Sequence, residues 1–492
     1  MSLALSGLAL SVLTCAAFAA EHWSQFRGPN GAGISETGAP PVSFGPDQNL
    51  RWKSPAPAGV SSPVVWGDRI FLTGVDDKKL LTLAYDATSG RELWRQIAPA
   101  EKLEATHPFS SPAASTPCTD GRLVFAYFNS FGVLAYDFNG KEVWRRPLPT
   151  LRTQYGSASS PVIVGGKLIV QRDGGTADSH LLALDPATGK TVWDSPRALA
   201  RDGHATPMLW RHDGKEELMV QGRGSLMAYD PATGESKWWV QGWGMAAIAT
   251  PVAGDGMLFG GSTSGGDPSE PPPPELNWDR LIAAHDANKD GALSLTEVPT
   301  TEVWQIRKDV SIETAGNSFP IRTLLKVYVD ANKDGVATKE EWEAMGASMN
   351  DRKNSDRFVA VRPGARENAT DSHVVWETTK GLNEMTSPLF YRGLVYILAD
   401  GGRLSVFRPA TGERVLDRQP IGLGGQYVAS PIAANGLIYV VNETGTVGVL
   451  RAGEKIDLVA KNLLSESVRS TPAIAGGKLI IRTGGHLWAF GG

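Results

Sequence analysis

One eleven-residue phrase, Ala183 to Trp193 (ALDPATGKTVW), constrains the fold of this chain more than any other feature. It recurs in the same frame at Ala84 to Trp94 and at Ala228 to Trp238, with Ala first, Asp third, Gly seventh and Trp eleventh. The Asp can accept hydrogen bonds from turn amides, and the Gly supplies the positive φ that closes a tight turn. Each phrase therefore predicts a strand, a turn and a second strand, and one Trp per unit predicts a wedge between neighbouring units.

A second marker, a small or hydroxyl residue followed by Pro and a β-rich run, recurs eight times. Successive markers lie 54, 44, 46, 44, 137, 43 and 41 residues apart. A period near 44 with about four short strands is typical of a β-propeller blade, so eight markers predict eight blades. The marker prolines are Pro63, Pro117, Pro161, Pro207, Pro251, Pro388, Pro431 and Pro472.

The eighth unit stops in the middle of its phrase, at Ala489 to Gly492. A strand around Leu50 to Lys53, which carries Trp52, belongs to no unit. Joining the two pieces completes the eighth blade and leaves no open sheet edge. The predicted fold is therefore all-β, an eight-bladed β-propeller closed by an N-terminal strand.

An insertion interrupts the fifth blade, because 137 residues separate Pro251 from Pro388 where the period is near 44. Gly265 to Pro274 is typical of a stiff spacer, although its proline run could instead be a recognition ligand. Phe358 to Val361 resumes the strand that precedes Trp376. We expect a signal peptide at 1–19, propeller at 20–264, a small α-helical insertion at 265–356 and propeller again at 357–492.

Two stretches of the insertion match the twelve-residue calcium loop of an EF-hand at every ligand position. Such a loop needs oxygen donors at positions 1, 3, 5 and 9, a backbone carbonyl at 7, a carboxylate at 12, and Gly at 6 for the bend. We therefore predict two calcium ions, bound for a structural or interaction role. The predicted ligands are Asp286, Asn288, Asp290, Ala292, Ser294 and Glu297 in the first loop, and Asp330, Asn332, Asp334, Val336, Thr338 and Glu341 in the second.

Amphipathic helices are predicted before both loops, since apolar residues there recur at helical spacing. An Asp-rich solvent turn is the alternative for a single loop, but it would have no reason to follow a helical face twice. The residues at this spacing are Trp278, Leu281, Ile282 and His285, and then Ile321, Leu324, Leu325 and Tyr328.

The first residues bear on the compartment. The chain is apolar from Leu3 to Ala20 and has a small-x-small cleavage pattern at Ala17 to Ala19, which predicts export. A retained membrane anchor is the alternative, because no Lys or Arg precedes the apolar run. Cleavage would leave Cys118 alone, a predicted buried strand residue with no disulfide partner. A net charge of -4 gives no reason to expect nucleic acid. We expect a periplasmic or secreted protein without a transmembrane segment after cleavage.

The A-x-D-x-x-x-G-x-x-x-W phrase resembles the tryptophan-docking motif of the quinoprotein-type eight-bladed propellers, over about residues 50–492 apart from the insertion. That superfamily includes pyrroloquinoline quinone (PQQ) dehydrogenases and non-enzymatic outer-membrane assembly lipoproteins, so the resemblance implies the fold and leaves both functions open. The dehydrogenases carry adjacent cysteines at the cofactor and a calcium site in the central funnel. This chain has no adjacent cysteines.

In rings of this kind the segment before each marker lies near the channel mouth, which nominates six residues. They are mixed in chemistry and show no triad or metal spacing, so we interpret them as the lining of a water-filled channel. We favour an exported binding or scaffold protein whose partner is a protein or a cell-envelope ligand. The alternative is a PQQ-dependent oxidoreductase, whose catalytic and cofactor-binding residues stay unassigned. The six residues are His107, Tyr155, His204, Glu384, Tyr427 and Arg469.

Overall fold

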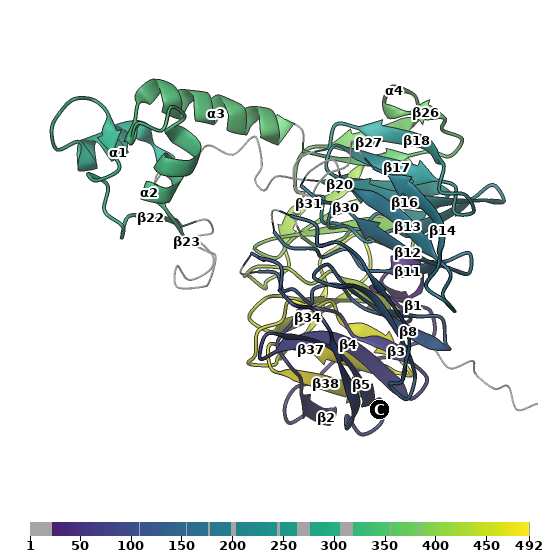
Figure 1. Ribbon diagram of the computed structural model, residues 1–492. Helices are drawn as coiled ribbons and strands as arrows, with labels where there is room; N and C mark the ends of the chain where they lie inside the picture. The colour runs from purple at the N-terminus through teal and green to yellow at the C-terminus, as the bar shows by residue number, and fades with distance from the viewer. Residues whose placement is uncertain are drawn as a thin grey trace, which may run out of the picture.

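The computed structural model describes residues 22–107, 109–153, 155–175, 178–197, 203–243, 247–262, 276–305, 318–354, 356–382 and 385–491. Eight sheets, each built on four antiparallel strands, follow one another around a ring (Figure 1), which confirms the predicted eight-bladed propeller. The predicted signal peptide and the spacer at 265–274 lie outside the described residues. The residue bounds of the predicted domains stay a prediction.

Each of the first four blades runs from an innermost strand to an outermost strand by antiparallel neighbours. Blade one comprises β3 (Val64–Trp66), β4 (Arg69–Asp76), β5 (Lys79–Asp86) and β6 (Glu92–Ala98); blade two, β7 (Cys118–Thr119), β8 (Leu123–Phe128), β9 (Gly132–Asp137) and β10 (Glu142–Pro147); blade three, β11 (Val162–Val164), β12 (Lys167–Arg172), β13 (His180–Leu184) and β14 (Thr191–Pro196); blade four, β15 (Met208–His212), β16 (Lys215–Gly222), β17 (Ser225–Tyr229) and β18 (Ser236–Gln241).

The last four blades follow the same order. Blade five comprises β19 (Val252–Gly254), β20 (Met257–Ser262), β25 (Arg357–Val361) and β27 (Val374–Thr378); blade six, β28 (Leu389–Tyr391), β29 (Leu394–Ala399), β30 (Arg403–Phe407) and β31 (Arg414–Pro420); blade seven, β32 (Ile432–Ala434), β33 (Leu437–Val441), β34 (Thr446–Arg451) and β35 (Leu458–Leu463); blade eight, β36 (Ala473–Ala475), β37 (Lys478–Arg482), β38 (His486–Gly491) and β2 (Leu50–Pro55).

The hydroxyl residue before each marker proline links the blades into a closed circuit. Each side-chain oxygen accepts a hydrogen bond from the backbone N–H of its counterpart in the preceding blade, at 2.9 to 3.2 Å. Except in blade seven, where β1 (Ile34–Ser35) pairs with β32, the innermost strand has no neighbouring strand on its channel side among the described residues, so a buried backbone donor there needs a side-chain acceptor. This need explains why Ser or Thr precedes the proline. The circuit runs through Ser62, Thr116, Ser160, Thr206, Thr250, Ser387, Ser430, Thr471 and back to Ser62.

The phrase Trp packs between neighbouring blades, as predicted. In five seams its indole N–H donates to a carbonyl of the next blade's phrase, at 2.7 to 3.3 Å. The ring lies on the phrase Gly: at Gly189, which has a φ of 69°, a Cβ would stand 2.5 Å from the Trp144 ring. The phrase therefore requires Gly both for its backbone angle and for the close approach of the indole. The donor and acceptor residues are Trp52 and Ala87, Trp94 and Phe138, Trp144 and Pro186, Trp193 and Pro231, and Trp376 and Pro409.

The N-terminal strand closes the ring. β2 pairs with β38 in antiparallel register, with Trp52 opposite Ala489 and Lys53 opposite Trp488. Trp52 then docks on blade one as the other phrase tryptophans dock on their neighbours. The closure predicted from the truncated eighth unit is therefore confirmed.

The seam between blades four and five departs from the pattern, because blade five has lost the phrase turn. Its replacement contains β26 (Glu367–Asn368) and α4 (Thr370–His373), and β26 adds a fifth, parallel strand to the outer edge of β18. Trp238 has no phrase Gly to dock on. Its indole N–H donates instead to the Glu217 carboxylate of its own blade, at 3.0 Å, and the ring is fully buried.

Residues 22–35 cross the channel one layer away from the hydroxyl circuit. They include η1 (Pro29–Gly31) and β1 (Ile34–Ser35), which pairs in parallel with β32. In four innermost strands the residue two positions after the marker proline donates its N–H to this segment. The segment therefore supplies hydrogen-bond acceptors for these four backbone N–H groups, which would otherwise have to bond to water in the channel. The donor and acceptor residues are Val65 and Trp23, Thr119 and Ser24, Leu209 and Asn30, and Ala433 and Gly33.

The insertion leaves blade five between β20 and β25 and stands beside the ring in Figure 1. It has its own hydrophobic core, which includes Trp278, Leu281, Leu293 and Ala337. Its elements are α1 (Trp278–His285), β21 (Leu293–Ser294), β22 (Val303–Gln305), β23 (Ser318–Pro320), α2 (Ile321–Leu324), η3 (Leu325–Val329), β24 (Val336–Ala337) and α3 (Lys339–Asn354).

One predicted helical face needs correction. Tyr328 was expected to share the buried face of the helix before the second loop, but it is 48% exposed. The cause is η3, a π-helical turn in which the Asp330 N–H reaches back five residues to the Leu325 carbonyl. A wider turn rotates the following side chains, so Val329, which is 1% exposed, takes the core position instead.

Candidate functional site

The first predicted calcium loop begins at the end of α1. Its Asp286 carboxylate accepts the Gly291 N–H at 3.0 Å, and Gly291 has a φ of 81°. At the other end, Glu297 accepts N–H groups from Ala287 and Asn288 at 3.1 and 3.3 Å. The amide of Ser294 also donates to Glu297 at 2.9 Å, and this bond leads those that lower the pKa of Glu297. These hydrogen bonds thus turn the carboxylates of Asp286 and Glu297, at the first and last ligand positions, toward the inside of the loop.

The second loop repeats this geometry. Asp330 accepts the Gly335 N–H at 3.0 Å, and Glu341 accepts N–H groups from Ala331 and Asn332 at 3.1 and 3.4 Å. Thr338 donates its N–H to Glu341 at 3.1 Å, and this bond leads those that lower the pKa of Glu341. Two loops built alike are therefore present in one small module.

The two loops are coupled by the pairing of β21 with β24, which places Leu293 opposite Ala337. Both residues are fully buried and hold position eight of their loops. Each loop offers three carboxylates, one Asn amide oxygen, one hydroxyl and one backbone carbonyl, a donor set that suits calcium. Among the described residues no three His, Cys, Asp or Glu side chains already converge as a metal cluster. Calcium binding by the two loops therefore stays a prediction.

The residues nominated at the channel mouth form an arc. The His107 ring contacts Tyr155 edge-on with centroids 5.7 Å apart, and Tyr155 contacts His204 at 6.0 Å. On the other side His107 stacks on Phe109 at 5.4 Å, and Arg469 lies over the Phe109 ring at 4.8 Å. Partial burial, and then the charge of Arg469, lower the pKa of His107. The structure thus brings four of the six nominated residues together.

Two acidic groups flank this arc. Glu443 is 6% exposed and accepts a hydrogen bond from Arg469 at 2.7 Å. Glu104 accepts hydrogen bonds from the Asn129 amide at 2.7 Å and from the Ser157 N–H at 3.1 Å, and burial raises its pKa. The arc therefore presents aromatic rings and the Arg469 cation beside a buried and a half-buried carboxylate, a chemistry suited to binding.

The other two nominated residues do not join the arc. Tyr427 is 1% exposed, and its hydroxyl donates to the Leu423 carbonyl at 2.8 Å within the core of blades six and seven. Tyr427 is therefore a packing residue. Glu384 lies outside the described residues.

The segment 22–35 contributes a feature that the sequence patterns did not reveal. Arg27 is fully buried and donates to the Pro388 carbonyl at 2.8 Å. Burial lowers the pKa of Arg27 to about 9. The only local signal was the Gly-rich stretch His22 to Gly33, which has no periodicity that predicts long-range contacts.

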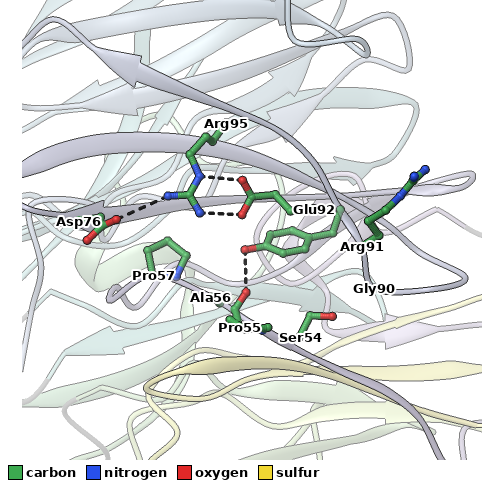
Figure 2. A pocket seen from close by; sticks show the side chains of 10 residues that line it. Ser54, Pro55, Ala56, Pro57, Asp76, Gly90, Arg91, Glu92 and Arg95 are labelled. Atoms are coloured by element: carbon green, nitrogen blue, oxygen red, sulfur yellow. Dashed lines mark hydrogen bonds and ion pairs between the residues drawn. The ribbon is translucent and has the colours of Figure 1, made fainter.

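A cavity of about 460 Å³ lies at the seam that β2 closes (Figure 2). The Tyr85 hydroxyl donates to the Pro55 carbonyl at 3.2 Å, and burial is the largest cause that raises the pKa of Tyr85 to about 12. Arg95 pairs with both Glu92 oxygens at 2.7 Å and lies 3.5 Å from Asp76. The charged side chains of this cavity are thus largely paired with one another, which favours a structural role for the seam.

Cys118, the predicted buried strand residue, is fully buried in β7, and burial raises the pKa of its thiol. None of the helices among the described residues has both the length and the apolar character needed to cross a bilayer.

The chain resembles several known propellers. BamB from Moraxella catarrhalis matches with a TM-score of 0.51 and 13% identity over 90% of this chain and 98% of that chain. A europium-containing methanol dehydrogenase matches with a TM-score of 0.54 and 12% identity over 96% of this chain and 98% of that chain. At this identity the likeness shows the fold alone. No curated protein sequence matches.

One family matches residues 45–177, 177–269 and 354–491 and thus covers both parts of the predicted propeller. Residues 270–353, which make up most of the predicted insertion, fall between the last two of these ranges. The chain belongs to the PQQ-like β-propeller family described as outer membrane protein assembly factor BamB.

Proposed function

We propose that this protein is an exported binding or scaffold propeller that holds two calcium ions in its inserted module. The observation that carries the calcium proposal is the pair of loops themselves, because both match at every ligand position, share the same amide pattern and are joined by β21 and β24. Extracellular modules of this kind bind calcium at roughly 10⁻⁴ to 10⁻³ M, which suits a structural role in the periplasm or outside the cell.

Three observations support binding rather than catalysis. The tryptophan and hydroxyl residues that repeat around the ring are committed to packing and to the closed circuit. The channel is crossed by residues 22–35. The arc offers aromatic rings and the Arg469 cation, and the family is described by an assembly role at the outer membrane. A protein or cell-envelope ligand is therefore the partner we propose.

Calcium titration tests the first part. Isothermal calorimetry on the wild-type chain is expected to show two ions per chain. Glu297→Gln and Glu341→Gln each remove one of three loop carboxylates, so each variant is expected to lose one site or to bind there at least about tenfold more weakly. The β-sheet circular dichroism is expected to stay unchanged, because the module has its own core.

Glu340→Gln is the matched control, since Glu340 is exposed and lies beside Glu341 on α3 but holds no ligand position. It is expected to bind two ions with wild-type affinity. No calcium uptake by the wild type, or equal uptake by Glu297→Gln and the wild type, would contradict the proposal.

Oxidation of alcohols or sugars is not expected when the purified protein receives PQQ, calcium and an artificial electron acceptor. The chain has no adjacent cysteines, and both carboxylates described beside the arc are engaged, since Glu443 pairs with Arg469 and Glu104 accepts hydrogen bonds from Asn129 and Ser157. Dye reduction in the wild type that disappears in Glu384→Gln would overturn the binding role and favour the quinoprotein alternative.

A further inference from the structure

The outermost strand of a blade has a free edge, and such edges attract other strands unless charge, proline or a covering segment protects them. Six of the eight outermost strands carry at least two protecting residues or are covered by another strand. The protecting residues are Glu92 and Arg95 in β6, Arg145, Arg146 and Pro147 in β10, Asp194 and Pro196 in β14, Arg414, Arg418 and Pro420 in β31, and Arg51, Lys53 and Pro55 in β2, while β26 covers β18.

The two remaining outermost strands, β27 and β35, carry one charge each. In β27 the charge, Glu377, pairs with Arg357 of the neighbouring strand, and a single large apolar residue, Val375, is exposed. In β35 the charge is Lys461, which has no acidic partner among the described residues. β35 is therefore the least protected edge of the ring.

β35 also exposes more apolar surface than any other outermost strand in the described part of the chain. Leu458, Val459 and Leu463 are 36, 39 and 54% exposed, whereas β6, β10, β14 and β27 each expose one large apolar side chain. Clustered exposed apolar residues on a soluble domain are typical of an interaction surface.

Residues 42–44 anchor β35 through the side chain of Asn462. The Asn462 side chain is buried, accepts the Phe44 N–H at 2.9 Å and donates to the Val42 carbonyl at 3.0 Å. Phe44 packs against Phe490 of blade eight, with ring centroids 4.8 Å apart, where the sequence of blade seven has no phrase Trp. This contact makes no backbone pair with β35, so β35 remains the last strand of its sheet among the described residues.

Blade four shows what such an edge accepts. β26 adds to β18 in parallel, with Trp238 opposite Glu367 and Trp239 opposite Asn368, and the Ala369 N–H donates to the Trp239 carbonyl at 2.8 Å. The outer edge of a blade in this ring thus accepts a fifth strand, here one of the same chain that Thr370 also anchors by accepting the Gln241 N–H at 2.9 Å.

We propose that the outer edge of β35 binds an extended segment of a partner protein by strand addition. Main-chain hydrogen bonds would give affinity, apolar side chains would pack on Leu458 on one face, and acidic residues would face Lys461 on the opposite face, which Val459 shares. A second copy of the chain fits less well, because self-pairing would bring Lys461 near its own counterpart without an acid. The inference rests on the proposed binding role and names the kind of partner.

The probe is a fluorescein-labelled, capped heptapeptide of alternating Val and Glu, followed by fluorescence anisotropy. The wild type is expected to bind it, and Val459→Glu and Lys461→Glu are expected to bind at least about tenfold more weakly, because each adds repulsion at the edge. Lys461→Glu is expected to prefer the peptide with Lys in place of Glu. Val143→Glu, on the protected strand β10, is the matched control and should bind as the wild type does.

A second arm separates strand addition from apolar adhesion: the same peptide N-methylated at alternate residues cannot form the ladder and is expected not to bind. Equal binding by Lys461→Glu and the wild type, binding of the methylated peptide, or no binding at all would overturn the inference. A dimer of the wild type in sedimentation that Val459→Glu abolishes would also overturn it in favour of a second copy. Calcium titration of the same samples tests the proposed calcium role separately, so failure of the peptide to bind can be distinguished from failure to bind calcium.

Discussion

Deletion of Asp47 to Ser54 is expected to lower the melting temperature of the propeller markedly. The deletion removes most of β2, exposes the edge of β38, and takes Trp52 out of the seam with blade one. Trp488 and Phe490 on β38 are 2 and 0% exposed and would lose part of their cover. Trp52→Ala, which keeps the strand, is expected to cost about 3–5 kcal/mol of unfolding free energy. Calorimetry and denaturant titration measure the two effects.

Val143→Ala is the control for both variants, because Val143 is 47% exposed on the rim and takes part in no seam. It is expected to unfold as the wild type does. An unchanged melting temperature in the deletion variant would contradict closure of the ring by β2.

Trp23→Ala is expected to destabilise the ring by about 3–5 kcal/mol. Trp23 is fully buried, and its backbone exchanges two hydrogen bonds of 2.8 Å with Val65 of the innermost strand of blade one. A Cβ on Gly28 would stand 2.6 Å from the Trp23 ring, so the ring and the following turn are fitted closely together. Loss of the indole should therefore loosen the whole segment 22–35 and admit water to the channel.

Trp304→Ala is the matched control, because Trp304 packs on the core of the inserted module and not in the channel. Denaturant unfolding followed by the β-sheet signal is expected to shift for Trp23→Ala and to stay near wild type for Trp304→Ala. Equal unfolding midpoints for Trp23→Ala and the wild type would show that the segment does not stabilise the ring.

The sequence by itself determined the blades, because their signals are local. A turn that needs positive φ at Gly189, and a Trp ten residues after the first Ala of the phrase, are requirements within one unit that recur from blade to blade. The hydroxyl residue before each marker proline could also be recognised in the sequence, although its hydrogen bond to the neighbouring blade could not. Only the ring shows that Ser62 and Thr471, far apart in the sequence, are hydrogen-bonded neighbours.

Other features depended on contacts between distant segments, which no spacing records. The acceptors for Val65 and Leu209 come from residues 22–35, and the partner of Trp238 changes because blade five has lost its phrase turn. Tyr328 was misplaced because a π-helical turn breaks the helical period that predicted it. The sequence placed all six nominated residues near one rim. Only the tertiary structure decided that four of them, His107, Tyr155, His204 and Arg469, lie together while Tyr427 turns into the core. The reason is that side-chain direction in a loop follows tertiary packing rather than a sequence period.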